Sequence, residues 1–443
     1  MKLKWEKFLE HGIYFLALIL PIQTRLIIKT LEIQGAPLEY GTVSIYLTDV
    51  FLLGLLALFL IYYFSSGLKI KENFNLPLYW WILAGLDLVL FLSIFWSQDK
   101  ILAVYNYLVF LLGVGLLFLI IKAKFNKLKF IYFFLVGLSL QALWGIFQFL
   151  NQYAPGFKYL GLASHDPENL GVSVVETIGA DGLGRRWLRA YGGLDHPNIL
   201  GAVLALGLLL ALILFIQKHF SGAKREGEQK YYLLEYLFLL ILTGGLFFSF
   251  SRAAWLGFLA GLVVLGLGFL FQKKWRYLQI LGKAVGFLSI LIIALSLTYP
   301  TIVKARLGGE GELEQRSNRE RIASLKEAKE IIKDNWLFGV GAGNYTLALK
   351  EKEPGKPGWY YQPVHNTFLL LWAETGILGI FLGIAFFLFL FIQSLREFSL
   401  TNLSLLVSLF VLMMFEHWWW SLHFGVLILG LLAGLMLRNL KKV

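Results

Sequence analysis

Two arginines and a histidine stand at the ends of apolar stretches, where their side chains could do chemistry. Arg189 lies just before a Gly-Gly turn, Arg252 occupies the short connector FFSFSRAAW, and His365 opens the apolar run HNTFLLL. An arginine at membrane depth is costly and usually faces a cavity or a partner, and its planar fork binds phosphate oxygens bidentately. An imidazole accepts a proton near neutral pH. These residue types predict an anion-binding site with a general base beside it.

The composition requires membrane helices to position these side chains. The chain has 443 residues, is 58% hydrophobic and 15% charged, and has a mean hydropathy of +0.68. This balance excludes a secreted globular enzyme, a disordered chain and a protein with a single anchor. The continuous apolar runs exclude an outer-membrane barrel, whose strands alternate. We predict an all-α polytopic membrane protein with about twelve transmembrane helices, near residues 11–29, 43–64, 78–97, 102–122, 128–150, 196–217, 231–249, 252–272, 279–299, 366–393, 400–416 and 417–437.

The distribution of charge predicts the orientation of these helices. The N-terminal MKLKWEK lacks a following small-residue cleavage site, so we expect an uncleaved first span with the N-terminus inside. The connectors then assigned to the inner side hold 21 basic and seven acidic residues, against 19 and 20 on the outer side. This is the positive-inside pattern, and it places both termini in the cytoplasm. The net charge of +12 therefore indicates membrane topology and no nucleic-acid partner.

Two long connectors, 151–195 and 300–365, fall on the predicted outer side, whereas every inner connector is short. Long loops on a rigid scaffold are where function usually lies. We accordingly divide the chain into helices 1–9 with the first outer loop (1–299), a second outer loop with a lid helix (300–365), and helices 10–12 (366–443). The active site is expected to face the outer side.

The second outer loop contains a helix signal. Ser317 and Glu320 fit a capping box, in which each side chain bonds the exposed amide of the other residue. Arg319 and Arg321 would lie in the first turn. The following apolar residues predict one stripe on a lid helix that lies along the membrane surface: Ile322, Leu325, Ile332 and Trp336.

Several other polar and glycine residues in these regions carry a prediction. Asn198 follows a proline and could begin a helix, and Asn366 stands beside His365. Glu374 is an intramembrane acid, and we expect it to pair with an arginine. The run GVGAGN lacks the preceding strand that a phosphate loop needs, so its glycines indicate tight turns.

The tail FEHWWWSLHFG is best explained as an aromatic belt at the membrane interface, although tryptophan faces can also stack on sugars. The chain has no cysteine, no HExxH, no Walker sequence and no Asp-x-Asp pair. We therefore predict no metal site and no cofactor.

Four stretches occur in an order that resembles the O-antigen ligase and O-antigen polymerase superfamily. They are RAYGGLDHPN, SRAAW, SNRERIASLKEAKEIIKDNWLFGVGAGNY and HNTFLLLWAETGILG. The twelve-span layout with a large outer loop before the tenth span is also similar. Two positions depart from the family pattern, because the family usually has an aromatic residue at Leu325 and a proline at Trp336.

The resemblance implies a metal-independent glycosyltransferase at the outer face of the bacterial inner membrane. Its donor would be a glycan on undecaprenyl diphosphate, and its acceptor the lipid A core or another sugar. By position, Arg189, Arg252 and Arg321 would bind the donor diphosphate and His365 would be the catalytic histidine. Asn198, Arg319, Asn366 and Glu374 would support them. Fixed cations stabilise a diphosphate leaving group, and an imidazole can deprotonate the acceptor hydroxyl.

Other functions stay open at this stage. Within the superfamily the protein could be a ligase, which we favour, or a polymerase that joins repeat units. A transporter or flippase of lipid-linked sugars would show internal repeats and broken helices at the midplane, and we find no repeat between the halves. A scaffold protein would not need arginines beside short turns, and a peptidoglycan polymerase would need its acid in a different motif.

Overall fold

The computed structural model describes residues 2–65, 76–178, 183–221, 229–308 and 312–438. Within these ranges, seven helices are long and apolar enough to cross a membrane: α2 (Leu47–Ser65), α4 (Lys100–Lys122), α5 (Lys127–Asn151), α6 (Pro197–Ser221), α8 (Arg252–Phe271), α9 (Trp275–Thr298) and α13 (Thr367–Arg396). Four shorter apolar helices lie in α3 (Leu78–Ser93), α7 (Gln229–Phe248), α14 (Leu400–Phe415) and α16 (His423–Leu437). The chain is thus a helical membrane protein, and these helices correspond to the predicted ranges from 43–64 onward.

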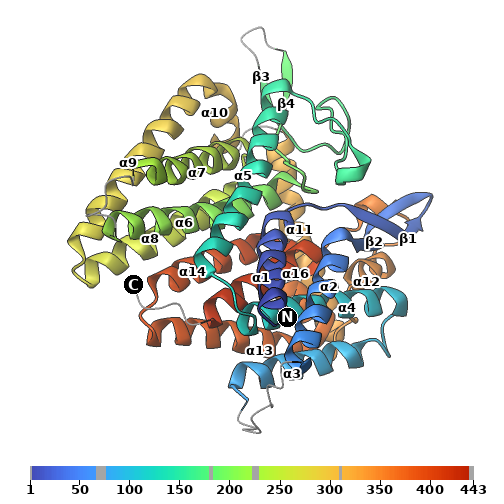
Figure 1. The fold of residues 1–443 in the computed structure, drawn as a ribbon. Helices are drawn as coiled ribbons and strands as arrows, with labels where there is room; N and C mark the ends of the chain where they lie inside the picture. The colour runs from blue at the N-terminus through green and yellow to red at the C-terminus, as the bar shows by residue number, and fades with distance from the viewer. Residues whose placement is uncertain (1, 66–75, 179–182, 222–228, 309–311, 439–443) are drawn as a thin grey trace.

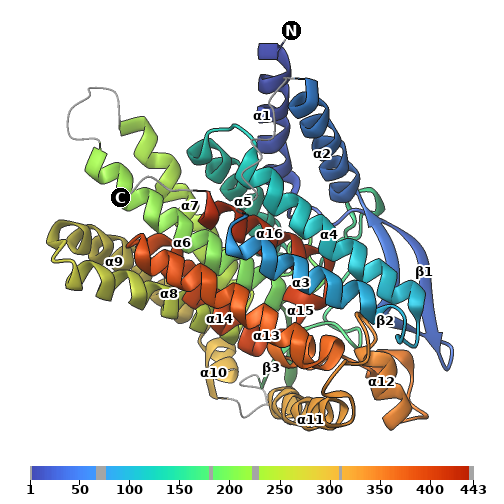
Figure 2. The same ribbon diagram turned by 90° about the horizontal axis from the view of Figure 1, so that it is seen from below.

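The helix α6 forms the centre of the bundle (Figure 1). Its most apolar stretch is entirely buried, and it packs against α5, α7, α8, α9 and α14. A helix that is apolar on all sides is suited to such an enclosed position. A second packed group brings α16 against α4 and α13 against α3 (Figure 2). At the α4–α16 contact, a Cβ added to Gly430 would clash with the backbone of Gly113, so glycine permits this close approach.

The prediction of an all-helical chain is wrong at the N-terminal end. Helix α1 (Lys2–Ile19) ends before the predicted first span does, and β1 (Arg25–Ile33) pairs antiparallel with β2 (Ala36–Tyr46). Pro21 disfavours the continuation of α1. Gln34 and Gly35 both have positive φ, which is the geometry of a two-residue hairpin turn. The hairpin lies beside α12 at one edge of the molecule (Figure 1).

The two long connectors contain further elements. The first, between α5 and α6, holds η1 (Lys158–Leu160) and the antiparallel pair β3 (Val174–Ile178) and β4 (Gly184–Leu188). The second, between α9 and α13, holds α10 (Pro300–Gly308), α11 (Glu312–Asn335), α12 (Tyr345–Lys352) and η2 (Gly358–Tyr360). Because α10 packs against β3, the two connectors meet at one end of the bundle.

The lid helix differs in detail from its prediction. Helix α11 includes Ser317 in its interior, so this serine is not an N-cap and the predicted capping box is wrong. The predicted apolar stripe is also wrong, because Ile322 and Leu325 are exposed and only Ile332 of the four is buried. The buried face of α11 instead carries Glu314, Ser324, Ala328, Ile331 and Ile332. Because this face carries small and polar residues, the hydropathy pattern did not predict that it would be buried.

The aromatic tail is buried rather than interfacial. Trp418 and Trp419 lie in the short helix α15 (Trp418–Ser421), stack on each other with ring centroids 3.9 Å apart, and are almost fully buried. The expected belt at the membrane interface is therefore wrong for these two residues. A tryptophan run next to a helix end can equally fill a core, because its large apolar surface favours either place.

Helix α13 is broken inside its apolar run. Gly376 has φ 68° and ψ −170°, and the carbonyls of Ala373 and Glu374 accept hydrogen bonds from the amides of Val340 and Gly341, both 2.9 Å. The amide of Ile377 donates to the carbonyl of residue 336 at 2.9 Å. Loop 336–341 thus satisfies the backbone groups that the break exposes, which a lipid environment cannot do.

The glycine run in this loop makes tight turns, as predicted. Gly339, Gly341 and Gly343 all have positive φ. A Cβ on Gly339 would meet the backbone of α13, and one on Gly341 would meet Ser97. Both conformation and space therefore require glycine at these positions.

Candidate active site

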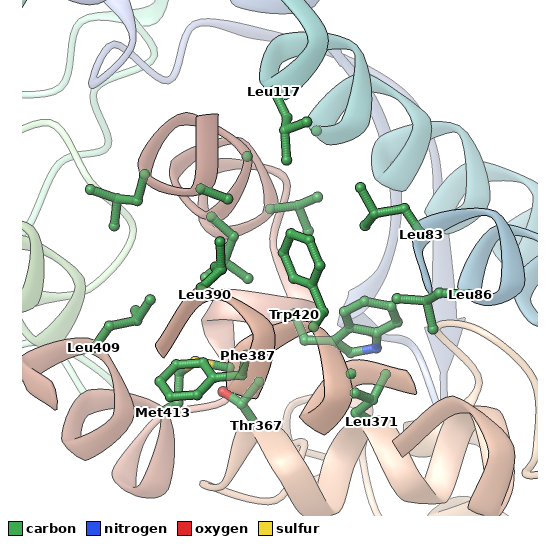
Figure 3. Close-up of a pocket in the computed structure, with 18 of the residues that line it drawn as sticks. Leu83, Leu86, Leu117, Thr367, Leu371, Phe387, Leu390, Leu409, Met413 and Trp420 are labelled. Atoms are coloured by element: carbon green, nitrogen blue, oxygen red, sulfur yellow. The ribbon is translucent and has the colours of Figure 1, made fainter. Parts of the chain in front are cut away.

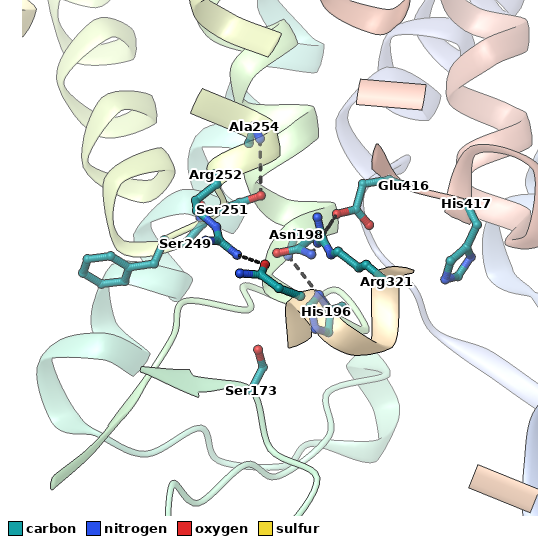
Figure 4. Close-up of polar contacts among 12 residues, drawn as sticks. Ser173, His196, Asn198, Ser249, Ser251, Arg252, Ala254, Arg321, Glu416 and His417 are labelled. Atoms are coloured by element: carbon teal, nitrogen blue, oxygen red, sulfur yellow. Dashed lines mark hydrogen bonds and ion pairs between the residues drawn. The ribbon is translucent and has the colours of Figure 1, made fainter. Parts of the chain in front are cut away.

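Polar side chains from several elements converge at the end of the bundle where the two long connectors meet (Figure 4). The starts of α6 and α8 and the end of α14 supply Asn198, Arg252 and Glu416. Helix α11 supplies Arg321, and the segment before α13 supplies His365. Residues that are more than 200 positions apart in the chain are thereby placed in one cluster.

The centre of the cluster is the buried carboxylate of Glu416. The amide Nδ2 of Asn198 donates to Glu416 Oε1 at 2.8 Å, and Arg321 Nη2 lies 3.6 Å from the same oxygen. The side chain of Glu416 is 5% exposed, whereas that of Arg321 is 26% exposed. The arginine therefore has its counterion inside the protein and part of its guanidinium accessible.

Arg189 is held entirely by the protein. Its Nε donates to the carbonyl of Ser249 (2.8 Å), its Nη1 to Ser173 Oγ (2.8 Å) and its Nη2 to Asn198 Oδ1 (2.6 Å). The residue is 4% exposed. With one bond from each nitrogen, the guanidinium is suited to orienting Asn198 toward Glu416 rather than to receiving a ligand.

Arg252 is the first residue of α8, and it follows Ser251, which caps the helix because its side chain accepts a hydrogen bond from the amide of Ala254. Its Nη2 lies 3.1 Å from both Glu314 Oε2 and Asn318 Oδ1. The Arg252 side chain is 29% exposed. Both partners belong to α11, so this arginine ties the lid helix to the start of α8.

A further arginine, Arg306 of α10, completes the base of the cluster. It forms an ion pair with Glu314, and its Nε donates to the carbonyl of Phe250 at 2.6 Å. Phe250 has φ 45°, a left-handed conformation that is rare for a bulky residue. The turn between α7 and α8 thus directs two successive carbonyls, of Ser249 and Phe250, to the buried arginines Arg189 and Arg306.

Three histidines, His365, His417 and His196, lie near Arg321. The rings of His365 and His417 have centroids 5.2 Å apart, and Tyr40 Oη of β2 lies 3.5 Å from His417 Nε2. His196 Nδ1 accepts from the amide of Asn198 at 3.1 Å. His365 Nδ1 is buried and has no hydrogen-bond partner among the described residues. A neutral imidazole with a nitrogen to spare can accept a proton from a bound hydroxyl.

The environment shifts the pKa values of these groups. Burial, and to a smaller extent the nearby Arg321, lowers the pKa of His365 to about 4. Burial also lowers the pKa values of His196 and His417. Burial raises the pKa of Glu416 to about 7, although Arg321 and Arg189 oppose this shift. All three imidazoles are therefore neutral at pH 7.

The structure separates three predicted site residues from this cluster. Arg319 is exposed and lies two positions from Arg321, which places it on the other side of α11. Asn366 caps α13 through the amide of Leu369 at 3.0 Å. Glu374 has no arginine partner among the described residues, so that prediction is wrong.

Glu374 instead belongs to the α13 break. Its carboxylate accepts from Trp420 Nε1 at 2.8 Å and from the amides of Gly343 and Tyr345. Backbone amides at a turn satisfy a buried carboxylate as well as a cation does. The intramembrane position of the acid was informative, but the sequence did not indicate which donors it would meet.

Sequence reasoning did not assign five residues of the cluster to a site, namely Arg306, Glu314, Glu416, His196 and His417. Glu416 and His417 were available as an acidic and an imidazole side chain directly after an apolar helix, which is the pattern that drew attention to Arg252. Arg306 and Glu314 lie in polar sequence and carry no such signal. Within the described ranges, no group of three or more histidine, aspartate or glutamate side chains could hold a metal ion.

Comparison with known families supports the resemblance found in the sequence. Residues 237–384 match the family model described as O-Antigen ligase, and the resemblance to the O-antigen ligase and polymerase superfamily is confirmed over this stretch. The matched segment contains Arg252, Arg321 and His365, whereas Arg189 and Glu416 lie outside it. The family indicates a glycosyltransferase-type enzyme of the membrane. A comparison with curated proteins gave no match.

Proposed function

We propose that the protein transfers a glycan from undecaprenyl diphosphate to an acceptor sugar at the outer face of the bacterial inner membrane, as an O-antigen ligase does. One observation carries this proposal. Two half-buried arginines, Arg252 and Arg321, stand with carboxylate partners at one end of the membrane helices, and a neutral His365 lies next to Arg321. This arrangement suits an anionic leaving group and an acceptor hydroxyl.

On the donor side, the glycosidic bond between the sugar C1 and the diphosphate oxygen breaks, and its electron pair goes to the diphosphate. Arg252 and Arg321 are proposed to bind the diphosphate oxygens, where their positive charge stabilises the negative charge that develops. Both guanidinium groups are already oriented by Glu314, Asn318 and Glu416, so little rearrangement is needed.

Arg189 is proposed to position the site rather than to touch the donor. Its three bonds hold Asn198, which donates to Glu416, and Glu416 in turn holds Arg321. Replacement of Arg189 would then affect the donor site indirectly, because Asn198 and Glu416 lie between Arg189 and Arg321. This refines the diphosphate role that the resemblance implies for Arg189.

On the acceptor side, His365 is proposed to take the proton of the attacking hydroxyl as the new C1–O bond forms. Burial, with a smaller contribution from the positive charge of Arg321, keeps the imidazole neutral and a weak base. A bound diphosphate would neutralise that charge, so donor binding should raise the basicity of His365 when it is needed. No metal is assigned a role in these steps.

The experiment that tests the proposal measures glycan transfer in purified protein with a lipid-linked donor, offering either lipid A core or a second lipid-linked repeat unit as acceptor. Transfer to the first acceptor supports a ligase, and transfer to the second would make the protein a polymerase. Translocation of the intact lipid-linked glycan in vesicles without any transfer would overturn the proposal.

The proposed orientation has its own test. The chain contains no cysteine, so single cysteines at Ser164 and Lys356, one in each long connector, can be labelled cleanly. An impermeant thiol reagent should label both in intact spheroplasts. Labelling only after permeabilisation would place the connectors, and the site with them, on the cytoplasmic side.

A further inference from the structure

An apolar space lies among the helices beside the candidate active site. Helices α3, α4, α13, α14 and α16 surround a cavity of about 140 Å³, and nearly all of its surface is apolar (Figure 3). Leu86, Leu117, Phe387, Leu409 and Met413 are among the side chains that point into it. Because the helices pack tightly elsewhere, at Gly245 and Gly261 for example, this space is a feature of the fold that needs an explanation.

Two residues of the cavity lining lie close to active-site residues. Thr367, which lines the cavity, follows His365 by two positions, and its Oγ1 donates to the carbonyl of Glu416 at 2.6 Å. Trp420, also in the lining, follows Glu416 by four positions. The same two segments, at the start of α13 and after α14, therefore carry the polar site on one side and the apolar space on the other.

We infer that this cavity holds part of the isoprenoid tail of the donor lipid, an inference that rests on the proposed function. A substrate whose diphosphate lies at Arg252 and Arg321 and whose tail is a hydrocarbon needs an apolar path that starts at the polar site. Of the described cavities, this one is almost wholly apolar and reaches the segment beside Glu416.

The size of the cavity favours a single chain over a phospholipid. A volume of about 140 Å³ accommodates roughly ten groups the size of a water molecule or methylene, which corresponds to about two isoprene units. One methyl-branched isoprenoid chain can enter such a space, whereas a lipid with two or more acyl chains would have to separate them. The remaining tail would lie in the bilayer.

A matched pair of substitutions on α3 tests the inference. Leu86 lines the cavity and is 6% exposed, whereas Leu88 on the same helix is 55% exposed. Leu86→Trp should raise KM for the lipid-linked donor by roughly three- to tenfold and leave kcat unchanged, because the displaced tail moves into bilayer rather than into water. Leu88→Trp should leave both values unchanged. Equal KM values in the two variants would overturn the inference.

A second measurement does not depend on activity or on the stability of a variant. A polyprenyl monophosphate with a diazirine in its tail is photolysed with the unmodified protein, and the labelled peptides are identified. Labelling at Phe387, Leu409 or Met413 that unlabelled polyprenyl diphosphate competes away supports the inference. Labelling confined to exposed residues such as Phe381, or equal competition by a two-chain phospholipid, contradicts it.

The two proposals can fail separately. If the purified protein transfers no glycan but the probe still labels the cavity, the proposed function is wrong and an isoprenoid site stands. If transfer proceeds while the cavity is unlabelled and Leu86→Trp has no effect, the inferred tail site is wrong and the proposed function is supported.

Discussion

The protein contains two buried carboxylates beside irregular helix ends, Glu416 in the active-site cluster and Glu374 in the break of α13, and they have opposite kinds of partner. Glu416 contacts Asn198 and a half-exposed arginine. Glu374 contacts backbone amides and Trp420. Both acids follow or interrupt an apolar helix, so their sequence contexts are alike.

The difference shows that the partner, and not the burial, separates a site from a structural support. A carboxylate that accepts hydrogen bonds from fixed backbone amides uses its hydrogen-bonding capacity within the fold. A carboxylate that pairs with a partly accessible cation leaves positive charge available to a ligand. The same reasoning divides the arginines, because Arg189 is enclosed by protein acceptors whereas Arg252 and Arg321 are in part accessible.

The largest expected effect belongs to the base. His365→Ala should lower kcat for glycan transfer by roughly a hundredfold to ten-thousandfold while donor binding persists. The acidic limb of wild-type kcat/KM should lie near the pKa of about 4 in the free enzyme rather than near 6.5, because the base must be unprotonated. His365→Gln separates proton transfer from hydrogen bonding alone. Near-normal turnover in His365→Ala, or loss of wild-type transfer with a chelator, would contradict the mechanism.

The next effect distinguishes accessible from enclosed or distant arginines. Arg252→Lys and Arg321→Lys keep the charge but lose the fork, and each should lower kcat/KM by about tenfold to a hundredfold, the cost of one charged hydrogen bond. Arg319→Lys is the matched control on α11 and should behave as wild type. Equal activity in Arg319→Lys and Arg321→Lys would place the diphosphate elsewhere.

The two carboxylates provide a direct test of the comparison. Glu416→Gln should reduce turnover severalfold in protein that still folds, because Arg321 loses its counterion. Glu374→Gln should lower the free energy of unfolding by about 1–3 kcal/mol through lost hydrogen bonding, and the melting temperature should decrease with it. Its turnover per folded molecule should be normal. Thermal unfolding and activity are measured on both variants. A reversal of the two outcomes would show that the division between site and support is wrong.

The smallest effect is a pH dependence of stability. Since burial raises the folded-state pKa of Glu416 from 4.5 to about 7, the folded protein binds the extra proton. The contribution of this group is complete below about 4.5 and is lost as pH rises toward 7. The melting temperature of the wild type, measured relative to that of the Glu416→Gln variant, should therefore decrease over this range. An unchanged slope would show that Glu416 does not titrate there.

Sequence reasoning located the apolar helices because hydropathy over a long window is a local property. It missed the β1–β2 hairpin because a strand of branched residues next to an apolar helix looks like the helix's continuation. Arg252, Arg321 and His365 could be identified from their positions at helix ends and in family-like motifs. Glu314 and Arg306 could not, since their importance comes from a contact with a turn about 60 residues earlier in the chain. The partner of Glu374 was likewise fixed by tertiary structure alone.

The break in α13 has a consequence for how the protein is made. The second half of α13 cannot enter the lipid while the carbonyls and the amide at the break have no hydrogen-bond partner. Each unpaired group costs several kcal/mol in a bilayer. Loop 336–341, which supplies the missing bonds, precedes α13 in the chain and leaves the ribosome first. The loop must therefore dock before or while α13 leaves the translocation channel, so the insertion of this helix is a tertiary folding step rather than an independent partitioning event.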